Sequence, residues 1–484
     1  YSQYLYRQYL NANITLLYFF YLLSLKLLFQ NRYRGFYNRC SGSNCPGKRR
    51  KGVQIFFGII VIAMSTTLAN FSIYEGMVYA AGYEHSKWET YLLAENVPEV
   101  QEALPVTVSD ADQNKDLNLY AQAAALLDGE TGRILYGKNA EALMPNASTT
   151  KILTCIIAIE QGNLDQICTA SEYACSMPET KCGFAPGESF YLKDLLYSLM
   201  LESQNDSAVV IAETIGGNVE QFAALMNEKA AEIGCQTYHF VTPNGLDGED
   251  AQGSHGVSAA DLAKIMNYCR KNKTFLEITQ AADHSFSNTE GTRQYQVQNK
   301  NAFLTMQNGI VSGKTGYTSK AGYCYVCSYE ENGRSYSIAL LACGWPNHKN
   351  YKWEDAKKLI AYGNEHFERK DIRQQNIEQQ AEVTGGIRFT EDGWEFPQSV
   401  SLQPGKETIE RLLALDETVT TQVRLDRKIT LPTNTDTAVG SLELYVGKDL
   451  VGSQKLYVKD EIEPFEYSLC VKLVLKEFLQ NLFT

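Results

Sequence analysis

Apolar and polar positions alternate in a strand-like pattern at two places that lie far apart in the chain. Residues 121–136 form two apolar runs around Asp128-Gly129-Glu130-Thr131-Gly132, the pattern of an antiparallel hairpin with a short glycine-containing loop. Strand patterns return at 323–328 and 336–343, on either side of a turn at 330–333. We therefore expect strands from both places to contribute to a sheet.

The part of the chain between these strands has helical periodicity. Residues 151–161 are apolar on nearly every side, which predicts a helix that is buried in the core. Further helical patterns lie at 192–200, 207–215, 219–233 and 353–367. Strands at both ends with helices between them predict an α/β (α+β) domain in which helices flank an antiparallel sheet.

The C-terminal part of the chain has a different pattern. A charged stretch at 368–380 predicts a domain boundary. Residues 383–460 are rich in Val, Thr and Leu with turn residues at short intervals, and only 407–415 has a helical period, so we expect a small all-β domain. The last stretch, 465–483, places apolar residues on one broad face, which predicts an amphipathic helix that lies at a membrane interface or docks on the β domain.

Length agrees with this division, because 484 residues at about 150 per domain predict two or three folded units. The predicted segments are a leader at 1–81 that contains a signal peptide at 48–81, a linker at 82–118, the α/β domain at 119–372, the β domain at 383–463 and the amphipathic tail at 464–484.

The leader has the features of a secretion signal. Four basic residues at 48–51 precede an apolar run at 53–68, and the small residues Ala80 and Ala81 follow, which predicts export through the cytoplasmic membrane. A retained membrane anchor is the alternative, although the apolar run is somewhat short for a span of about 20 residues. We assign no function to residues 1–47.

Charge and cysteine usage exclude several classes of function. The net charge is −12 with no basic block outside the leader, so we expect no nucleic-acid partner. The twelve cysteines are scattered singly along a long chain, which favours buried free thiols over a disulfide scaffold. Cys324-Tyr-Val-Cys327 has the spacing of a metal or redox pair, but its surroundings alternate like a strand. We expect no metal or other cofactor.

The first candidate for chemistry opens the buried helix. Ser148 and Lys151 in Ser-Thr-Thr-Lys are three residues apart and therefore share a helix face, so the hydroxyl and the amine can meet. A lysine whose pKa is lowered by burial or by another cation can accept the serine proton and activate the nucleophile. Alone, this short pattern is common, and helix capping by Ser148 is the simpler reading.

Two further motifs follow in the chain. Ser203-Gln204-Asn205 lies in a predicted loop, where the hydroxyl could relay a proton and the amide could hold a substrate carbonyl; helix capping is the alternative role. Lys314-Thr315-Gly316 enters a predicted strand, and its positive charge and hydroxyl suit a peptide that ends in a carboxylate. We expect Gly316 to let a substrate backbone approach closely.

The three motifs in this order are far more specific than any one of them. They form the active-site set of penicillin-binding proteins and class A β-lactamases, and the chain resembles the low-molecular-mass D-alanyl-D-alanine carboxypeptidases of clostridia and bacilli from residue 121 to about 367. Supporting stretches are 137–140, 145–151, 194–197, Thr242-Pro243-Asn244-Gly245-Leu246 and 312–318, with His255, Ser258, Asp261, Asn299 and Asn301 as scaffold positions around the cleft.

This resemblance implies a function and a role for each motif residue. The enzyme would remove the terminal D-alanine from peptidoglycan stem peptides that end in D-Ala-D-Ala, and β-lactams would inhibit it covalently. Ser148 would be the acylated nucleophile and Lys151 its base, with Ser203 and Asn205 as the second cleft wall. Lys314 and Thr315 would grip the substrate, and the backbone N–H groups of Ser148 and Tyr317 would form the oxyanion hole.

One position departs from some relatives. Where they carry an arginine for the substrate carboxylate, this chain offers Lys352, which lacks the bidentate fork of a guanidinium. Two other functions share the motifs: a β-lactamase and a noncatalytic sensor of wall peptides. The sequence has no E-x-x-L-N segment between Asn205 and Lys314, and the stray candidate Glu249 lies in a solvated turn, which disfavours a lactamase.

Overall fold

The computed structural model of the protein describes residues 117–390, 393–425, 429–466, 468–469 and 471–472. The predicted leader, nearly all of the predicted linker and most of the predicted tail lie outside the described residues. In the part of the chain that is described, we find no helix that is both long enough and apolar enough to cross a membrane.

A five-stranded antiparallel sheet forms the centre of the N-terminal part, in the order β11-β12-β13-β1-β2. The strands are β1 (Ala123–Asp128), β2 (Ile134–Lys138), β11 (Ile310–Thr318), β12 (Gly322–Glu331) and β13 (Arg334–Leu341). The predicted hairpin is β1–β2, and β1 also pairs with β13, with Ala125 opposite Ala339. The strands from the two distant places in the sequence therefore do share one sheet.

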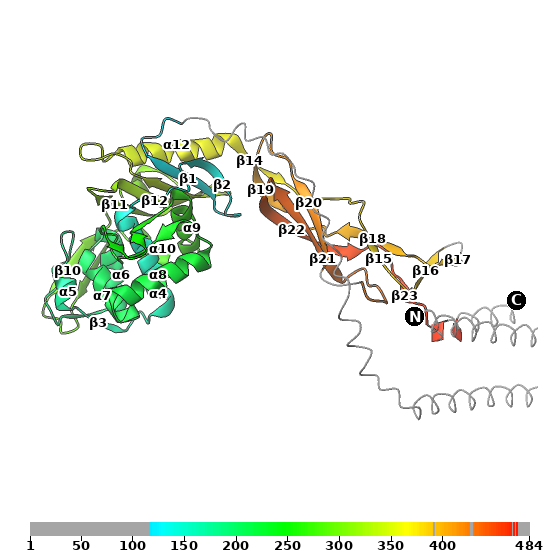
Figure 1. The fold of residues 1–484 in the computed structure, drawn as a ribbon, viewed down its shortest axis with the longest axis horizontal. Coiled ribbons are helices and arrows are strands. Elements are labelled where there is room, and N and C mark those ends of the chain that lie inside the picture. The colour runs from blue at the N-terminus through cyan, green and yellow to red at the C-terminus, as the bar shows by residue number, and fades with distance from the viewer. Residues whose placement is uncertain (1–116, 391–392, 426–428, 467, 470, 473–484) are drawn as a thin grey trace, which may run out of the picture. The chain divides into compact units, whose positions relative to one another are not determined.

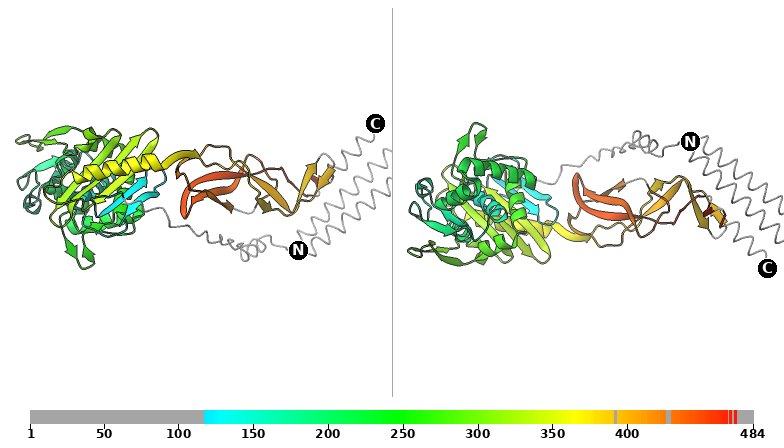
Figure 2. Two further views of the ribbon diagram at one scale, coloured as in Figure 1. Left: turned by 90° about the horizontal axis from the view of Figure 1, so that it is seen from above. Right: turned by 90° about the horizontal axis from the view of Figure 1, so that it is seen from below.

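Both faces of this sheet are buried, which explains why β1 is apolar throughout. Ala123, Ala125 and Leu127 pack into a large core with most of the helices. Ala124 and Leu126, which point the other way because side chains alternate along a strand, pack under α12 (Tyr351–His366). Figure 2 shows α12, in yellow, across one face of the sheet and the green helices across the opposite face. The predicted α/β (α+β) fold class, an antiparallel sheet between helices with an added β region, is confirmed.

The helices predicted at 151–161, 192–200, 207–215, 219–233 and 353–367 are present, and four further helices, at 172–175, 259–269, 273–280 and 303–306, were not predicted (Figure 1). Before α12, the helices and helical turns are the 3-10 turn η1 (Ala147–Thr150), α4 (Lys151–Gln161), α5 (Glu172–Cys175), α6 (Leu192–Tyr197), the π-helical turn η2 (Ser198–Glu202), α7 (Asn205–Gly216), α8 (Val219–Ile233), α9 (Ala259–Cys269), α10 (Lys273–Gln280) and α11 (Phe303–Met306). Helix α4 is buried over Lys151–Ala158, as its all-apolar pattern predicts.

Short strand pairs connect these helices at the surface. They are β3 (Ile167–Thr169) with β4 (Ser189–Tyr191), β5 (Tyr238–His239) with β8 (Gly256–Val257), β6 (Glu249–Asp250) with β7 (Gly253–Ser254), and β9 (Asp283–Ser287) with β10 (Gln294–Gln298).

The C-terminal part is a set of antiparallel strands. They are β14 (Phe367–Asp371), β15 (Gln380–Glu382), β16 (Gly386–Thr390), β17 (Gly393–Glu395), β18 (Ser399–Pro404), β19 (Glu410–Ala414), β20 (Thr420–Leu425), β21 (Ala438–Val446), β22 (Asp449–Val458) and β23 (Glu463–Pro464). The helical period at 407–415 is not realised, because β19 pairs with β14 and buries Leu412 and Leu413 as strand residues. The charged stretch at 368–380 begins within strand β14.

The nine cysteines within the described residues are free thiols, and seven of them are buried. Cys324 and Cys327 face opposite sides of β12, since Cys324 packs into the helix-side core and Cys327 packs under α12. The Cys-x-x-Cys spacing therefore does not bring the two sulfur atoms onto one face. Burial raises the pKa of both thiols, which keeps them protonated.

Candidate active site

The candidate nucleophile lies on a tight turn at the start of α4. Ala147 has φ 49°, an uncommon conformation for a residue with a Cβ, and the 3-10 turn η1 follows directly. The buried Asn146 braces this turn, since its Nδ2 donates to Thr149 Oγ1 at 3.1 Å and to Thr150 Oγ1 at 2.9 Å. Ser148 is thereby held half-exposed at the end of a buried helix.

Lys151 is fully buried beneath Ser148 and has three polar contacts. Its Nζ lies 2.8 Å from Ser148 Oγ and donates to Asn205 Oδ1 and to the backbone oxygen of Asn244, each at 2.8 Å. Burial holds the pKa of Lys151 well below its usual value, and the positive charge of Lys314 lowers it further, whereas Asp206 opposes this shift. The predicted pair of hydroxyl and amine is therefore formed.

Asn205 is oriented by a loop that precedes it in the chain. It begins α7, its backbone N–H donates to Thr180 O at 2.7 Å, and its Nδ2 donates to Pro178 O at 3.2 Å. Because a carbonyl oxygen only accepts, this contact fixes the amide with Oδ1 towards Lys151. Asn205 is thus an acceptor for the lysine, a contact that the sequence motif does not reveal.

The backbone oxygen of Asn244 is a member of the site that sequence reasoning did not assign. It accepts from Lys151 and lies 3.4 Å from Ser148 Oγ. The turn that carries it needs Gly245, which has φ +79° and whose absent Cβ would lie 1.9 Å from Ala147 O. The stretch Thr242–Leu246 is one of the family-like segments of the sequence, but a contribution from the backbone leaves no side-chain signal there.

His255 holds this turn against the nucleophile helix. Its Nδ1 accepts from the N–H groups of Val241 at 3.0 Å and Thr242 at 3.3 Å, so its Nε2 carries the proton and donates to Thr150 Oγ1 at 2.9 Å. Burial lowers the pKa of His255 to about 4, with the charge of His239 a smaller cause. The imidazole is therefore neutral at pH 7.

Ser203 and Lys314 form the opposite side of the site. Ser203 has φ 67° at the end of the π-helical turn η2, a strained conformation that turns its side chain out of the helix line. Lys314 lies in β11, and its Nζ donates to Ser203 Oγ and to Thr315 O, each at 2.8 Å. Burial lowers the pKa of Lys314 to about 7. The second and third motifs are therefore in direct contact.

Gly316 brings β11 against the nucleophile turn. A Cβ at this position would lie 2.9 Å from Ser148 N, 3.0 Å from Asn146 O and 3.0 Å from Thr149 N. The close neighbour in this structure is thus the chain's own backbone, whereas we had expected the glycine to make room for substrate. Tyr317 follows with an exposed ring, 4.8 Å from the ring of Tyr323.

Lys352 lies apart from these contacts. It is buried near the start of α12, where it donates to Lys349 O and lies over the rings of Trp353 at 4.5 Å and Tyr323 at 4.9 Å. Burial lowers its pKa to about 8. Between Lys352 and the site lie the rings of Tyr323 and Tyr317, which contact each other at an interplanar angle of 40°.

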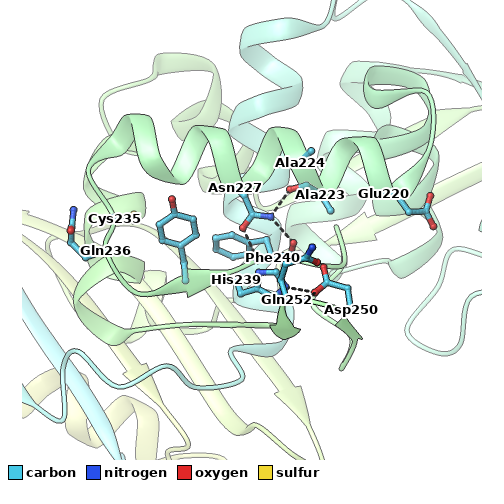
Figure 3. A pocket seen from close by; sticks show the side chains of 11 residues that line it. Glu220, Ala223, Ala224, Asn227, Cys235, Gln236, His239, Phe240, Asp250 and Gln252 are labelled. Carbon is cyan, nitrogen blue, oxygen red and sulfur yellow. Dashed lines mark hydrogen bonds and ion pairs between the residues drawn. The ribbon is translucent and has the colours of Figure 1, made fainter.

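A separate hollow of about 590 Å³ lies beside α8, and Figure 3 shows its lining. None of the predicted site residues lines it. Its principal polar groups are already paired: Asn227 bonds the backbone of Ala223 and Phe240, and His239 Nε2 lies 2.7 Å from Asp250 Oδ1. We therefore place the chemistry at Ser148 and not in this hollow.

Comparison with known proteins agrees with this geometry. The profile of the D-alanyl-D-alanine carboxypeptidase family matches residues 108–342. D-alanyl-D-alanine carboxypeptidase DacF of Bacillus subtilis is 26% identical over 363 residues, which cover 73% of this chain and 89% of that protein. D-alanyl-D-alanine carboxypeptidase DacB2 of Mycobacterium tuberculosis is 33% identical over 248 residues, which cover 50% of this chain and 82% of that protein.

A solved structure is also similar to this chain. Penicillin binding protein 5 from Haemophilus influenzae superposes with a TM-score of 0.54 at 25% identity, over 71% of this chain and 98% of that chain. This overlap covers a larger part of the chain than the family profile, which ends at residue 342.

Proposed function

Because this chain belongs to the D-alanyl-D-alanine carboxypeptidase family of serine peptidases, we propose that Ser148 is its nucleophile and Lys151 the general base that activates it. The enzyme removes the terminal D-alanine from peptidoglycan peptides in the cell wall. The observation that carries the assignment of residues is the set of three contacts around Lys151 Nζ.

These contacts favour a neutral lysine that can accept a proton. A neutral amine has two N–H groups and one lone pair, and two of the three partners, Asn205 Oδ1 and Asn244 O, only accept. The lone pair is then left for the third partner, the hydroxyl of Ser148. The lowered pKa of Lys151 supports the same protonation state, because burial disfavours the charged form.

The reaction follows from this arrangement. As Ser148 Oγ bonds to the carbonyl carbon of the penultimate D-alanine, its proton passes to Lys151 Nζ. The C–N bond to the terminal D-alanine then breaks, and the departing nitrogen takes a proton that Lys151 and Ser203 supply. Water hydrolyses the remaining ester and restores the Ser148 hydroxyl.

Substrate binding is assigned to β11 and the opposite wall. Lys314 and Thr315 would bind the terminal carboxylate, because a buried cation beside a hydroxyl favours an anionic group. Asn205 would hold the peptide amide from the other side. The N–H groups of Ser148 and Tyr317 would stabilise the oxyanion, and the close approach of β11 to the Ser148 turn at Gly316 supports this pairing.

Lys352 is proposed as an outer contact for the substrate carboxylate, acting beyond Tyr317. The support is its position over the ring of Tyr323, which in turn lies against Tyr317. A single ammonium there would attract the carboxylate without the directional grip of an arginine.

We also propose that the enzyme is exported and works at the outer face of the cytoplasmic membrane. The signal-like sequence at 48–81 supports export, and the amphipathic sequence of the tail supports peripheral attachment to the membrane. β-Lactams are expected to acylate Ser148, since they present a strained amide to the same nucleophile.

Release of D-alanine from a synthetic peptide ending in D-Ala-D-Ala tests the proposed function. We expect stoichiometric release by the intact protein, and slow hydrolysis of the penicilloyl enzyme. Rapid turnover of penicillin with no D-alanine release would indicate a β-lactamase, and binding without any turnover would indicate a sensor. Glu249, the stray candidate for a deacylating carboxylate, is exposed on β6, which disfavours the first of these outcomes.

A further inference from the structure

Four aromatic side chains are exposed together on β16 and β17 and at the residues that directly follow β17 and β23. They are Phe389, Trp394, Phe396 and Phe465, which we call the aromatic tip, and each is about half exposed. Phe389 is paired with Trp394 across the strands, and Phe396 contacts Trp394 at 5.3 Å and Phe465 at 4.8 Å between ring centroids. In Figure 1 these strands lie together at the end of the β region away from β14.

The aromatic tip is an apolar surface and not an extension of the core. None of its four residues belongs to the buried cluster of the β region. Arg388, the neighbour of Phe389 in β16, is already paired, because it bonds Glu395 and also Asp460 at 2.7 Å. Exposed aromatic rings gathered in this way are costly in water and mark contact surfaces.

Continuity of the chain indicates what the surface contacts. Phe465 is fixed to the sheet by its N–H bond to Gly385 O at 2.8 Å, and the amphipathic tail sequence starts at this residue. Three residues of chain span at most about 10 Å, so a tail that lies on a membrane from Ser468 onward keeps Phe465 within about 10 Å of the same membrane, with Phe396 and Trp394 next to it.

We propose that the aromatic tip rests in the interfacial layer of a lipid bilayer and forms a second membrane contact beside the tail. This inference rests on the proposed peripheral attachment of the protein and deepens it. Trp and Phe suit this position, since aromatic rings are favoured where apolar chains meet headgroups. The exposed Glu461, Glu463 and Glu466 around the aromatic tip favour a neutral, zwitterionic surface over an anionic one.

The fluorescence of Trp394 tests the proposal in the full chain with phosphatidylcholine vesicles. Spin-labelled lipids carry a quencher at a shallow or a deep position of the acyl chain, and a Trp394→Phe variant identifies the contribution of this one tryptophan. We expect Trp394 to be quenched by the shallow label more than by the deep label. Vesicle-bound protein in which neither label quenches Trp394 would overturn the proposal.

Variants that keep Trp394 as the reporter test the surface itself. Phe389→Ser combined with Phe396→Ser should raise the lipid concentration for half-maximal quenching about tenfold or more, because apolar area is lost. The exposed Leu450, at the start of β22, provides the matched control, and Leu450→Ser should leave this concentration unchanged. An equal response of the two variants would contradict a specific role of the aromatic tip.

A chain that ends after Tyr467 separates this inference from the attachment on which it rests. Truncation could abolish vesicle binding although neither spin-labelled lipid quenches Trp394 of the intact protein. In that case the protein is attached through its tail, and the aromatic tip has no part in the attachment. If Trp394 of the intact protein is protected from aqueous acrylamide without vesicles and truncation exposes it, the tail covers the tip and the proposal fails. Release of D-alanine from soluble peptide should be unchanged in every variant.

Discussion

At the scale of single residues, the geometry of the site depends on which atoms donate hydrogen bonds and which accept them. Asn205 is oriented towards Lys151 because its amide N–H donates to Pro178 O. His255 carries its proton on Nε2 because two backbone N–H groups donate to its Nδ1. The sequence motifs predicted Ser148, Lys151, Ser203 and Lys314 as site residues, and the structure places Lys151 against Ser148 and Lys314 against Ser203. The motifs could not reveal the role of Asn244, because its backbone oxygen accepts a hydrogen bond from Lys151 and every residue type has such an oxygen.

Acylation by penicillin should depend on pH through Lys151. Because burial and the charge of Lys314 lower the pKa of Lys151, the rate should fall as pH falls through that lowered pKa. Lys314→Met removes the neighbouring charge, so the fall should begin at a higher pH. Lys151→Ala should reduce the rate by about 10²–10⁴-fold and abolish this pH dependence, as measured by stopped-flow acylation. If the pH profile of acylation is the same in Lys314→Met as in the unchanged protein, the charge of Lys314 does not lower the pKa of Lys151. Lys193→Ala removes the charge of an exposed lysine and serves as the control.

His255 should make the fold sensitive to acid. The pKa of His255 is about 4 in the folded protein and about 6.5 in an unfolded chain. Between pH 4 and pH 6.5 the unfolded chain therefore binds a proton at His255 that the folded protein does not bind. The stabilising contribution is present above pH 6.5 and is lost as pH falls towards 4, by about 3 kcal/mol in total. Urea unfolding at pH 7 and pH 4.5 should show this loss, and His255→Gln should reduce it. The same loss in both proteins would exclude His255 as the cause.

At the scale of elements, the sequence predicted most helices and the sheet because their periodicity reflects burial on one or both faces. Helices α4 and α8 begin and end where the pattern does, at Lys151–Gln161 and Val219–Ile233. The failure at 407–415 has a physical cause, since pairing with β14 overrides a local helical period. The π-helical turn before Ser203 was also not predicted, because it depends on how α6 meets α7 and not on local composition.

The approach of β11 to the nucleophile turn should tolerate no side chain at Gly316. Gly316→Ala would place a Cβ 2.9 Å from Ser148 N, and either the strand or the turn must move. A shift of about 1 Å at the nucleophile reduces turnover by about 10²-fold, so we expect a loss of this size in the release of D-alanine. Gly405→Ala, where the nearest atoms lie 3.5 Å away, is the matched control and should keep full activity. Full activity of Gly316→Ala would show that the contact is dispensable.

At the scale of the whole molecule, catalysis and attachment are assigned to different parts. The site lies within 146–317, whereas the aromatic tip and the tail sequence follow residue 388. The similarity to penicillin binding protein 5 covers 71% of this chain, a larger part than the family profile at 108–342. The sequence predicted a β region from its composition, but its pairing depends on long-range register that composition does not encode.

A chain that ends at Pro464 should lose membrane attachment and keep its chemistry. The removed residues include Phe465, Leu469 and Val471, whose apolar area contributes about 25 cal/mol per Å² when buried, and the tail lysines can extend to the headgroups. Liposome co-sedimentation and release of D-alanine from soluble peptide measure the two properties separately. Equal liposome binding by both chains would show instead that the tail packs on its own domain.

The most direct test of the central claim is the site of covalent labelling by penicillin. Mass spectrometry of the digested, penicillin-treated protein should find one penicilloyl group, on the peptide that contains Ser148. Ser148→Ala should abolish both this adduct and the release of D-alanine, without a change in the melting temperature. An adduct on another serine, or labelling that persists in Ser148→Ala, would contradict the account.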